Sequence, residues 1–174
     1  MNTLLTPLLI AALVAVLSAC GRPDSATEPL GAAQLSFDEL VERCRQSIDA
    51  REPQVRQTSG GEWIKEGFSA ALVQGEVQAT DSAVTPYVGK IVVKDNLALA
   101  TAPTQTEAAA VMLSPVHLVA NRTHTLVLSF DGQTWRWNNG SLATKMPLRD
   151  NATAPLTPAG LSAAEPGFAA CLPR

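Results

Sequence analysis

The residues of this chain that could carry out catalysis or hold a metal are few, and their spacing does not assemble a site. The two histidines are His117 and His124, and neither has a sequence context typical of a metal ligand or a catalytic base. Ser82 could serve as a nucleophile only beside such a base. The neighbouring carboxylates Asp38 and Glu39 fit the first turn of a helix better than an acid–base pair. We therefore expect no catalytic constellation, no metal and no cofactor.

One cysteine stands in a pattern that does imply chemistry. Residues 4–17 form an uncharged apolar stretch, shorter than the roughly 20 residues that a spanning helix needs, and small residues follow it. The stretch ends in Leu17-Ser18-Ala19-Cys20, which resembles the lipobox of bacterial lipoproteins. The resemblance implies a diacylglyceryl group on the Cys20 thiol and cleavage of the chain between Ala19 and Cys20.

The same resemblance implies a place in the cell. Residues 1–19 would be a lipoprotein signal peptide, and acyl chains such as palmitate on Cys20 would hold the mature chain on a bilayer. Gly21 in place of aspartate favours the outer membrane, with the protein facing the periplasm. Residues 20–34 are poor in large apolar side chains, so they are predicted to form a flexible tether. An uncleaved amino-terminal anchor is the alternative.

Cys44 and Cys171 remain once Cys20 is assigned to lipid. An exported protein meets an oxidising compartment, so we expect these two thiols to form a disulfide. Two unrelated thiols are the alternative, because the histidines are not spaced to complete a metal site. Closing a loop of about 130 residues would stabilise the fold by about 4–5 kcal/mol in the chain-entropy model.

A helix is predicted to open the folded domain, which covers residues 35–174. Ser36 and Glu39 match a capping box, in which two side chains satisfy free N–H groups at the start of a helix. The apolar residues that follow have helical spacing: Phe37, Leu40, Val41, Cys44 and Ile48. Cys44 is therefore expected to point inward.

The middle of the chain has the alternating pattern of strands. The predicted strands are 68–79, 88–94, 97–101, 116–121, 123–130 and 133–138. A short helix over 105–112 is expected from a second capping box, Thr104 with Glu107. From Pro147 onward, repeated prolines predict an irregular tail that is ordered mainly where Cys171 holds it.

Two tryptophans lie in the clearest hairpin of the sequence, which turns at Asp131-Gly132. A two-residue loop there gives the cross-strand pairs Phe130–Gln133, Leu128–Trp135 and Leu126–Trp137. Trp135 and Trp137 then share a face with aliphatic and aromatic side chains. We expect this face to pack in the core and not to bind glycan.

Trp63, Asp81, Ser82 and Tyr87 are the candidates for a ligand or partner site. Trp63 follows two glycines and is the better candidate for a glycan platform. The other three belong to residues 77–91, whose turn formers fit a strand, a tight loop and a strand, with a ligand loop as the alternative.

The segment 77–91, with the helix and aromatic hairpin that follow it, is similar to small bacterial envelope lipoprotein domains. The resemblance covers about residues 65–138 and implies a fold family without an assigned chemistry.

These elements predict one α+β domain, with an N-terminal helix packed on a curved antiparallel sheet of five or six strands. An all-β sandwich with an appended helix is the alternative. A net charge of −3 without a basic block excludes a nucleic-acid partner. We expect a membrane-anchored envelope lipoprotein that binds or scaffolds an envelope protein or glycan without being an enzyme. A periplasmic inhibitor or accessory protein of an envelope enzyme is the alternative, followed by a hydrolase acting on envelope material.

Overall fold

The computed structural model of the protein describes residues 27–174, with side chains from Leu30 onward. The predicted signal peptide and the lipobox with Cys20 lie outside the described residues. A seven-stranded antiparallel sheet forms the domain, with α1 (Thr27–Asp49) packed across one face. The strands are β1 (Gln54–Gln57), β2 (Trp63–Phe68), β3 (Leu72–Ala79), β4 (Tyr87–Ala102), β5 (Leu118–Phe130), β6 (Trp135–Lys145) and β7 (Ala152–Pro155). The predicted α+β class is confirmed.

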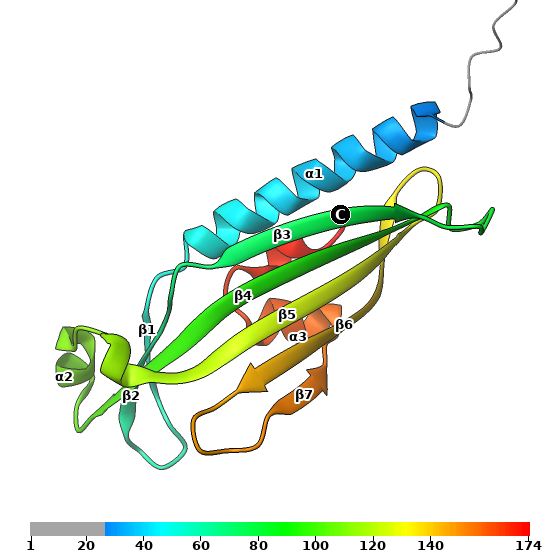
Figure 1. The fold of residues 1–174 in the computed structure, drawn as a ribbon. Coiled ribbons are helices and arrows are strands. Elements are labelled where there is room, and N and C mark those ends of the chain that lie inside the picture. Colours follow the sequence, from blue (N-terminus) through cyan, green and yellow to red (C-terminus); the bar gives the residue numbers. More distant parts are fainter. Residues whose placement is uncertain (1–26) are drawn as a thin grey trace, which may run out of the picture.

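The order of the strands is β1-β2-β4-β5-β6-β7, and β3 also pairs with β4. β4 is long enough to pair with β3 over Tyr87–Lys94 and with β2 over Leu97–Ala102. The short helices are α2 (Gln105–Ala110), α3 (Pro158–Ala164), η1 (Pro115–His117) and η2 (Phe168–Cys171). Figure 1 shows β4 and β5 running on past the C-terminal end of α1 toward α2.

The sheet has more strands than predicted because the sequence interpretation missed β1, β7 and residues 63–67 of β2. β1 and β7 carry no alternating apolar pattern. Each has four residues, and almost all of them are exposed. Several predicted breaks are also wrong: 88–94 and 97–101 are parts of the single strand β4, and residues 118–121 and 123–130 are parts of the single strand β5. The first two residues of the predicted strand 116–121 lie in the short helix η1. Conversely, the predicted strand 68–79 divides into the end of β2 and the whole of β3.

α1 begins at Thr27, well before the predicted start at Ser36. Ser36 lies inside the helix, where its hydroxyl donates to the carbonyls of Ala32 and Ala33 at 2.9 and 3.0 Å, so it forms no capping box. Residues 27–34 therefore belong to α1 and not to a flexible tether. Alanine is the best helix former, and Ala33 is fully buried, which explains why the helix extends this far.

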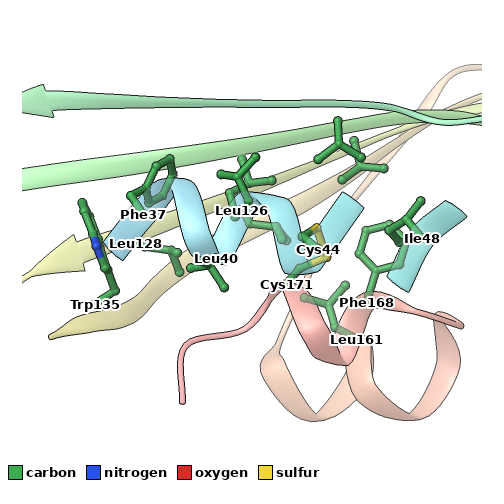
Figure 2. Close-up of a cluster of buried hydrophobic side chains, with 14 of the residues drawn as sticks. Phe37, Leu40, Cys44, Ile48, Leu126, Leu128, Trp135, Leu161, Phe168 and Cys171 are labelled. Carbon is green, nitrogen blue, oxygen red and sulfur yellow. A yellow bond between two sulfur atoms is a disulfide. The ribbon is translucent and has the colours of Figure 1, made fainter. Parts of the chain in front are cut away.

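The predicted apolar stripe of the helix is confirmed, since Phe37, Leu40, Val41, Cys44 and Ile48 are all buried. Phe37 packs against the backbone of β4, and its ring occupies the space that a Cβ at Gly89 would need. A larger residue at position 89 would push α1 away from the sheet. Figure 2 shows Phe37 and Leu40 beside Leu126, Leu128 and Trp135 of β5 and β6. It shows Cys44 and Ile48 at the end of the cluster that holds Cys171 and Phe168.

The hairpin has the predicted face but not the predicted register. Phe130 pairs with Trp135 and Leu128 with Trp137, a shift of two residues from the expected pairs. The third expected pair, Leu126 with Trp137, is also wrong, because the register changes between Val127 and Leu128 and Leu126 pairs with Gly140. Asp131 N–H donates to the Thr134 carbonyl, so the two central residues of the loop are Gly132 and Gln133. Gly132 has a φ of 94°, and the Asp131 carboxylate accepts from the Gln133 and Thr134 N–H groups. A shift of two keeps every side chain on its face.

The segment from Pro147 is not an irregular tail. It forms β7, α3 and η2, and it places Leu161, Phe168 and Cys171 in the core. Thr157 caps α3 by accepting from the Gly160 N–H, and Pro158 fits the first turn of the helix. The prolines lie at the ends of elements and do not prevent order.

The expected disulfide between Cys44 and Cys171 is present, with its two cysteines 127 residues apart in the sequence. Both half-cystines are fully buried beside Phe168 and Leu161 (Figure 2). The bridge joins α1 to η2, so it fixes the C-terminal segment against the helix.

We expect a Cys44→Ala/Cys171→Ala variant to lose about 2–5 kcal/mol of unfolding free energy, because the cross-link restricts the unfolded chain. Urea denaturation of the full chain, followed by circular dichroism, measures this loss. Adding a reductant to the parent protein should shift its midpoint in the same direction. A variant that unfolds at the parent's urea concentration would show that the bridge contributes no stability.

Candidate functional site

A buried group of charged side chains lies just beyond the C-terminal end of α1. This ion-pair cluster consists of Arg51, Asp95, Arg122, His124 and Glu165. Arg122 binds Asp95 in bidentate fashion, with its Nε and Nη2 donating at 2.9 and 2.8 Å, and Arg51 Nη1 donates to the same carboxylate at 2.8 Å. Arg122 Nη1 also donates to Glu165 Oε2 at 3.0 Å. The cluster therefore joins four separate parts of the chain.

The positions of Asp95 and Arg122 follow from strand geometry. Asp95 continues the inward-facing alternation of β4, and Arg122, directly opposite it on β5, continues that of β5. Arg51 comes from the turn after α1, and its Nε also donates to the Ile48 carbonyl at 2.9 Å. Glu165 is the residue at which α3 ends.

Two phenylalanines cover the charges. The guanidinium carbons of Arg51 and Arg122 lie 4.4 and 4.7 Å from the centre of the Phe68 ring, within cation–π distance. The His124 ring packs on Phe168, with 4.2 Å between the ring centres. This apolar cover keeps water away from the ion pairs and strengthens them.

The burial of the cluster and its opposite charges act on pKa values in opposite directions. Burial raises the pKa of Asp95, but Arg122 and Arg51 lower it by more, so this pKa lies below its ordinary value. The pKa of Glu165 is also lowered, because nearby His124 and Arg122 outweigh its burial. Burial lowers the pKa of Arg122, and Asp95 and Glu165 raise it further than burial lowers it. All three groups are therefore charged at neutral pH.

His124 is the least satisfied member of the cluster. It is fully buried, and neither ring nitrogen has a hydrogen-bond partner within the described residues. Its Nε2 lies 3.5 Å from Glu165 Oε2, a longer separation than that of the arginine contacts. The two arginines and the two carboxylates of the cluster balance each other in charge.

The cluster holds separate segments of the chain together. The Asp95 side chain has no exposed surface, and three charge-assisted hydrogen bonds occupy its oxygens. In the described part of the chain, no three His, Cys, Asp or Glu side chains are grouped so that they could hold a metal ion. Arg122 and Glu165 also line an open groove.

This apolar groove is the feature of the domain best shaped to bind something. Its volume is about 690 Å³. It lies on the same face of the sheet as α1, because paired residues of neighbouring strands share a face: Leu142 is paired with the inward-facing His124, and Leu97 with Ala120. The groove is lined by Leu97, Leu99, Leu118, Val119, Ala120, Arg122, Leu142, Thr144, Met146, Pro147, Arg149 and Glu165. Ligand pockets commonly have 300–1,000 Å³ and mostly apolar walls.

The candidate residues from the sequence do not form one site. Trp63 is half-buried at the start of β2, where it pairs with Ala102 at one end of β4. Tyr87 begins the same strand at its other end and is buried against Phe130. Asp81 and Ser82 are exposed in the β3–β4 loop. About 50 Å of strand therefore separates Trp63 from the other three.

The histidines, which the sequence treats alike, differ in environment. His117 is in η1, where its Nδ1 accepts from the Ser114 N–H at 3.1 Å. His124 belongs to the ion-pair cluster. The sequence interpretation missed the cluster because Arg51, Asp95, Arg122 and Glu165 are far apart in the chain. A signal was available: Asp95 and Arg122 occupy positions at which the strand alternation predicts buried side chains.

Together, the fold and groove define a small α+β domain with a helix-covered sheet and an open apolar hollow at one end. Comparison with known protein families, curated proteins and solved structures found no match for this chain. Among the helices of residues 27–174, none has the length and apolar character needed to cross a membrane.

Proposed function

We propose that the protein is a membrane-anchored envelope lipoprotein whose domain is a non-enzymatic binding module. The observation that supports the binding role is the apolar groove at the end of the sheet. Strands β4, β5 and β6 form its floor, and Arg122 and Glu165 of the ion-pair cluster form its inner end. A groove on paired strands keeps its shape without a ligand, which lowers the entropy cost of binding.

The lipobox Leu17-Ser18-Ala19-Cys20 supports the anchor. Only residues 21–26 separate Cys20 from the first residue of α1, and so few residues can span at most about 20 Å. The proposed protein therefore stands close to its bilayer. The proposed location is the periplasmic side of the outer membrane.

A Cys20→Ala variant tests the anchor. We expect the parent to incorporate a labelled fatty acid in growing bacteria, whereas the variant stays unlabelled and unprocessed. The Cys44→Ala/Cys171→Ala variant is the matched control, because it removes two cysteines without touching the lipobox. Equal labelling of the parent and the Cys20→Ala variant would contradict the proposal.

A charge placed in the groove tests the binding role. Leu118 lines the groove and is 42% exposed. Leu72, on another strand, is 52% exposed and does not line the groove, so Leu72→Glu is the matched control for Leu118→Glu. The three proteins are purified from isolated envelopes, and co-purifying molecules are identified by mass spectrometry. The proposal requires a component that the parent and Leu72→Glu retain and that Leu118→Glu loses. If no component follows this pattern, the groove is not the binding site.

The β3–β4 loop favours a second candidate, an inhibitor or accessory protein of an envelope enzyme. Its tip, residues 81–84, is exposed, with Val84 at 78%. Thr80 holds the loop closed by donating to the Thr85 carbonyl. Figure 1 shows this loop projecting at the end of the sheet opposite α2. A Val84→Glu variant that loses a co-purifying enzyme, beside an unaffected Leu118→Glu variant, would favour this candidate.

A further inference from the structure

We infer that the groove accepts a single aliphatic chain that ends in a carboxylate, as in a long-chain fatty acid. This inference rests on the proposed binding module and names its ligand class. Three properties of the groove carry the inference: the chemistry of its walls, the absence of a covering element, and the distribution of charge from its inner end to its mouth.

The walls suit a flexible aliphatic chain. They are formed by leucine, valine, alanine, proline and methionine side chains from three strands and the β6–β7 turn, and no aromatic ring lines them. A sugar or a planar ring is usually held by stacking on an aromatic side chain, which this groove does not offer. Methionine is unbranched and flexible, so it can adapt its shape to a chain of methylene groups.

No described element covers these walls. Arg51, just after α1, reaches only as far as Asp95, and the next inward residues of β4 are Leu97 and Leu99, which are half-exposed. Leu118 across the groove is more exposed still. Each buried methylene contributes about 0.8 kcal/mol, so an acyl chain that replaces water along these leucines gains stability with its length.

The charges place the carboxylate at the mouth. At the inner end, Arg122 and Glu165 neutralise each other, and Asp95 accepts from Nε and Nη2 of Arg122. Arg149 lines the outer end, is exposed, and forms no ion pair within residues 30–174. The groove thus carries one uncompensated positive charge, which complements a single anionic head and not a cationic one.

The experiment is photo-crosslinking of hexadecanoate in isolated envelope vesicles that contain the full-length protein. The probe carries a diazirine on its chain. Isolated vesicles are used so that the probe does not enter the lipid anchor by metabolism. We expect labelled peptides to come from residues 97–99, 118–120 and 142–149, and excess unlabelled hexadecanoate to suppress them.

Two variants locate the chain and the head. Leu118→Glu should reduce labelling about tenfold or more, because a charge in the apolar groove opposes a buried chain, whereas Leu72→Glu should label like the parent. Arg149→Glu should reduce hexadecanoate labelling about two- to fivefold, the range for an exposed ion pair. A diazirine analogue of hexadecanol, which has no charge, should label the parent and Arg149→Glu equally.

The outcomes separate this inference from the proposed function. Labelling outside the groove, or equal labelling of the parent and Leu118→Glu, would overturn the inference. Stronger labelling by a two-chain glycerophosphate probe than by hexadecanoate would assign the groove to membrane phospholipid and also overturn it. If Leu118→Glu loses a co-purifying component while hexadecanoate labels no variant, the binding module stands and the ligand class is wrong.

Discussion

Replacing Asp95 with alanine is expected to lower the free energy of unfolding by about 3–5 kcal/mol, because it leaves two buried arginines without their shared counter-charge. Arg51 and Arg122 are 3% and 7% exposed in their side chains, so water cannot take the place of the carboxylate. Urea denaturation of the full chain, with circular dichroism as the readout, measures the loss.

Glu76→Ala is the matched control for Asp95→Ala. Glu76 forms an ion pair with Lys90, but both side chains are more than 40% exposed, and such pairs contribute about 0–1 kcal/mol. We expect this variant to unfold near the parent. If Asp95→Ala and Glu76→Ala had the same midpoint, the cluster would not hold the C-terminal segment to the sheet.

Replacing Trp135 with alanine should cost about 3–5 kcal/mol and lower the Tm by about 10 °C. Trp135 is 6% exposed, and its ring centre lies 4.9 Å from that of Phe37 and 5.1 Å from that of Phe130. Its Nε1 also donates to Ser36 Oγ at 3.1 Å and to the Ala33 carbonyl at 3.3 Å. The variant therefore removes both a core side chain and a link to α1.

Trp63→Ala and Trp137→Ala are the controls for the Trp135 variant. Both tryptophans are half-buried, so we expect each replacement to lower the Tm less than Trp135→Ala does. Thermal unfolding followed by circular dichroism measures all three. A Trp135→Ala protein that melts with the parent would show that this ring is not part of the core.

The sequence predicts best what depends on periodicity. The spacing of Phe37, Leu40, Cys44 and Ile48 identifies the buried face of α1, and the alternation in 126–130 identifies the inner face of the hairpin. Periodicity is insensitive to register in steps of two, which is why the hairpin face is right although the pairs of Phe130 and Leu128 are each shifted by two residues. It also says little about where an element begins, as the early start of α1 shows.

The site could be predicted only in part because it depends on contacts between distant residues. Arg122 meets Glu165 across 43 positions of sequence, and Arg51 meets Asp95 across 44. No local pattern encodes such a pairing. The groove is harder still to predict from the sequence, since Leu97, Leu118 and Leu142 have the pattern of ordinary strand residues. They line a groove only because the sheet extends beyond the end of α1.

The place of η2 in the core also determines when the domain can finish folding. Phe168 and Cys171 pack against α1, whose Cys44 is synthesised 127 residues earlier. Until this late segment emerges, the inner side of α1 lacks its contacts with Phe168 and Leu161, and Cys44 lacks Cys171. Contacts between residues so far apart in the sequence form slowly. If the chain is exported as proposed, nearly all of it passes through the translocation channel before the stable fold exists. The chain would then remain unfolded during transport because its last segment is needed for the stable fold. Both thiols would be in the oxidising compartment when folding brings them together.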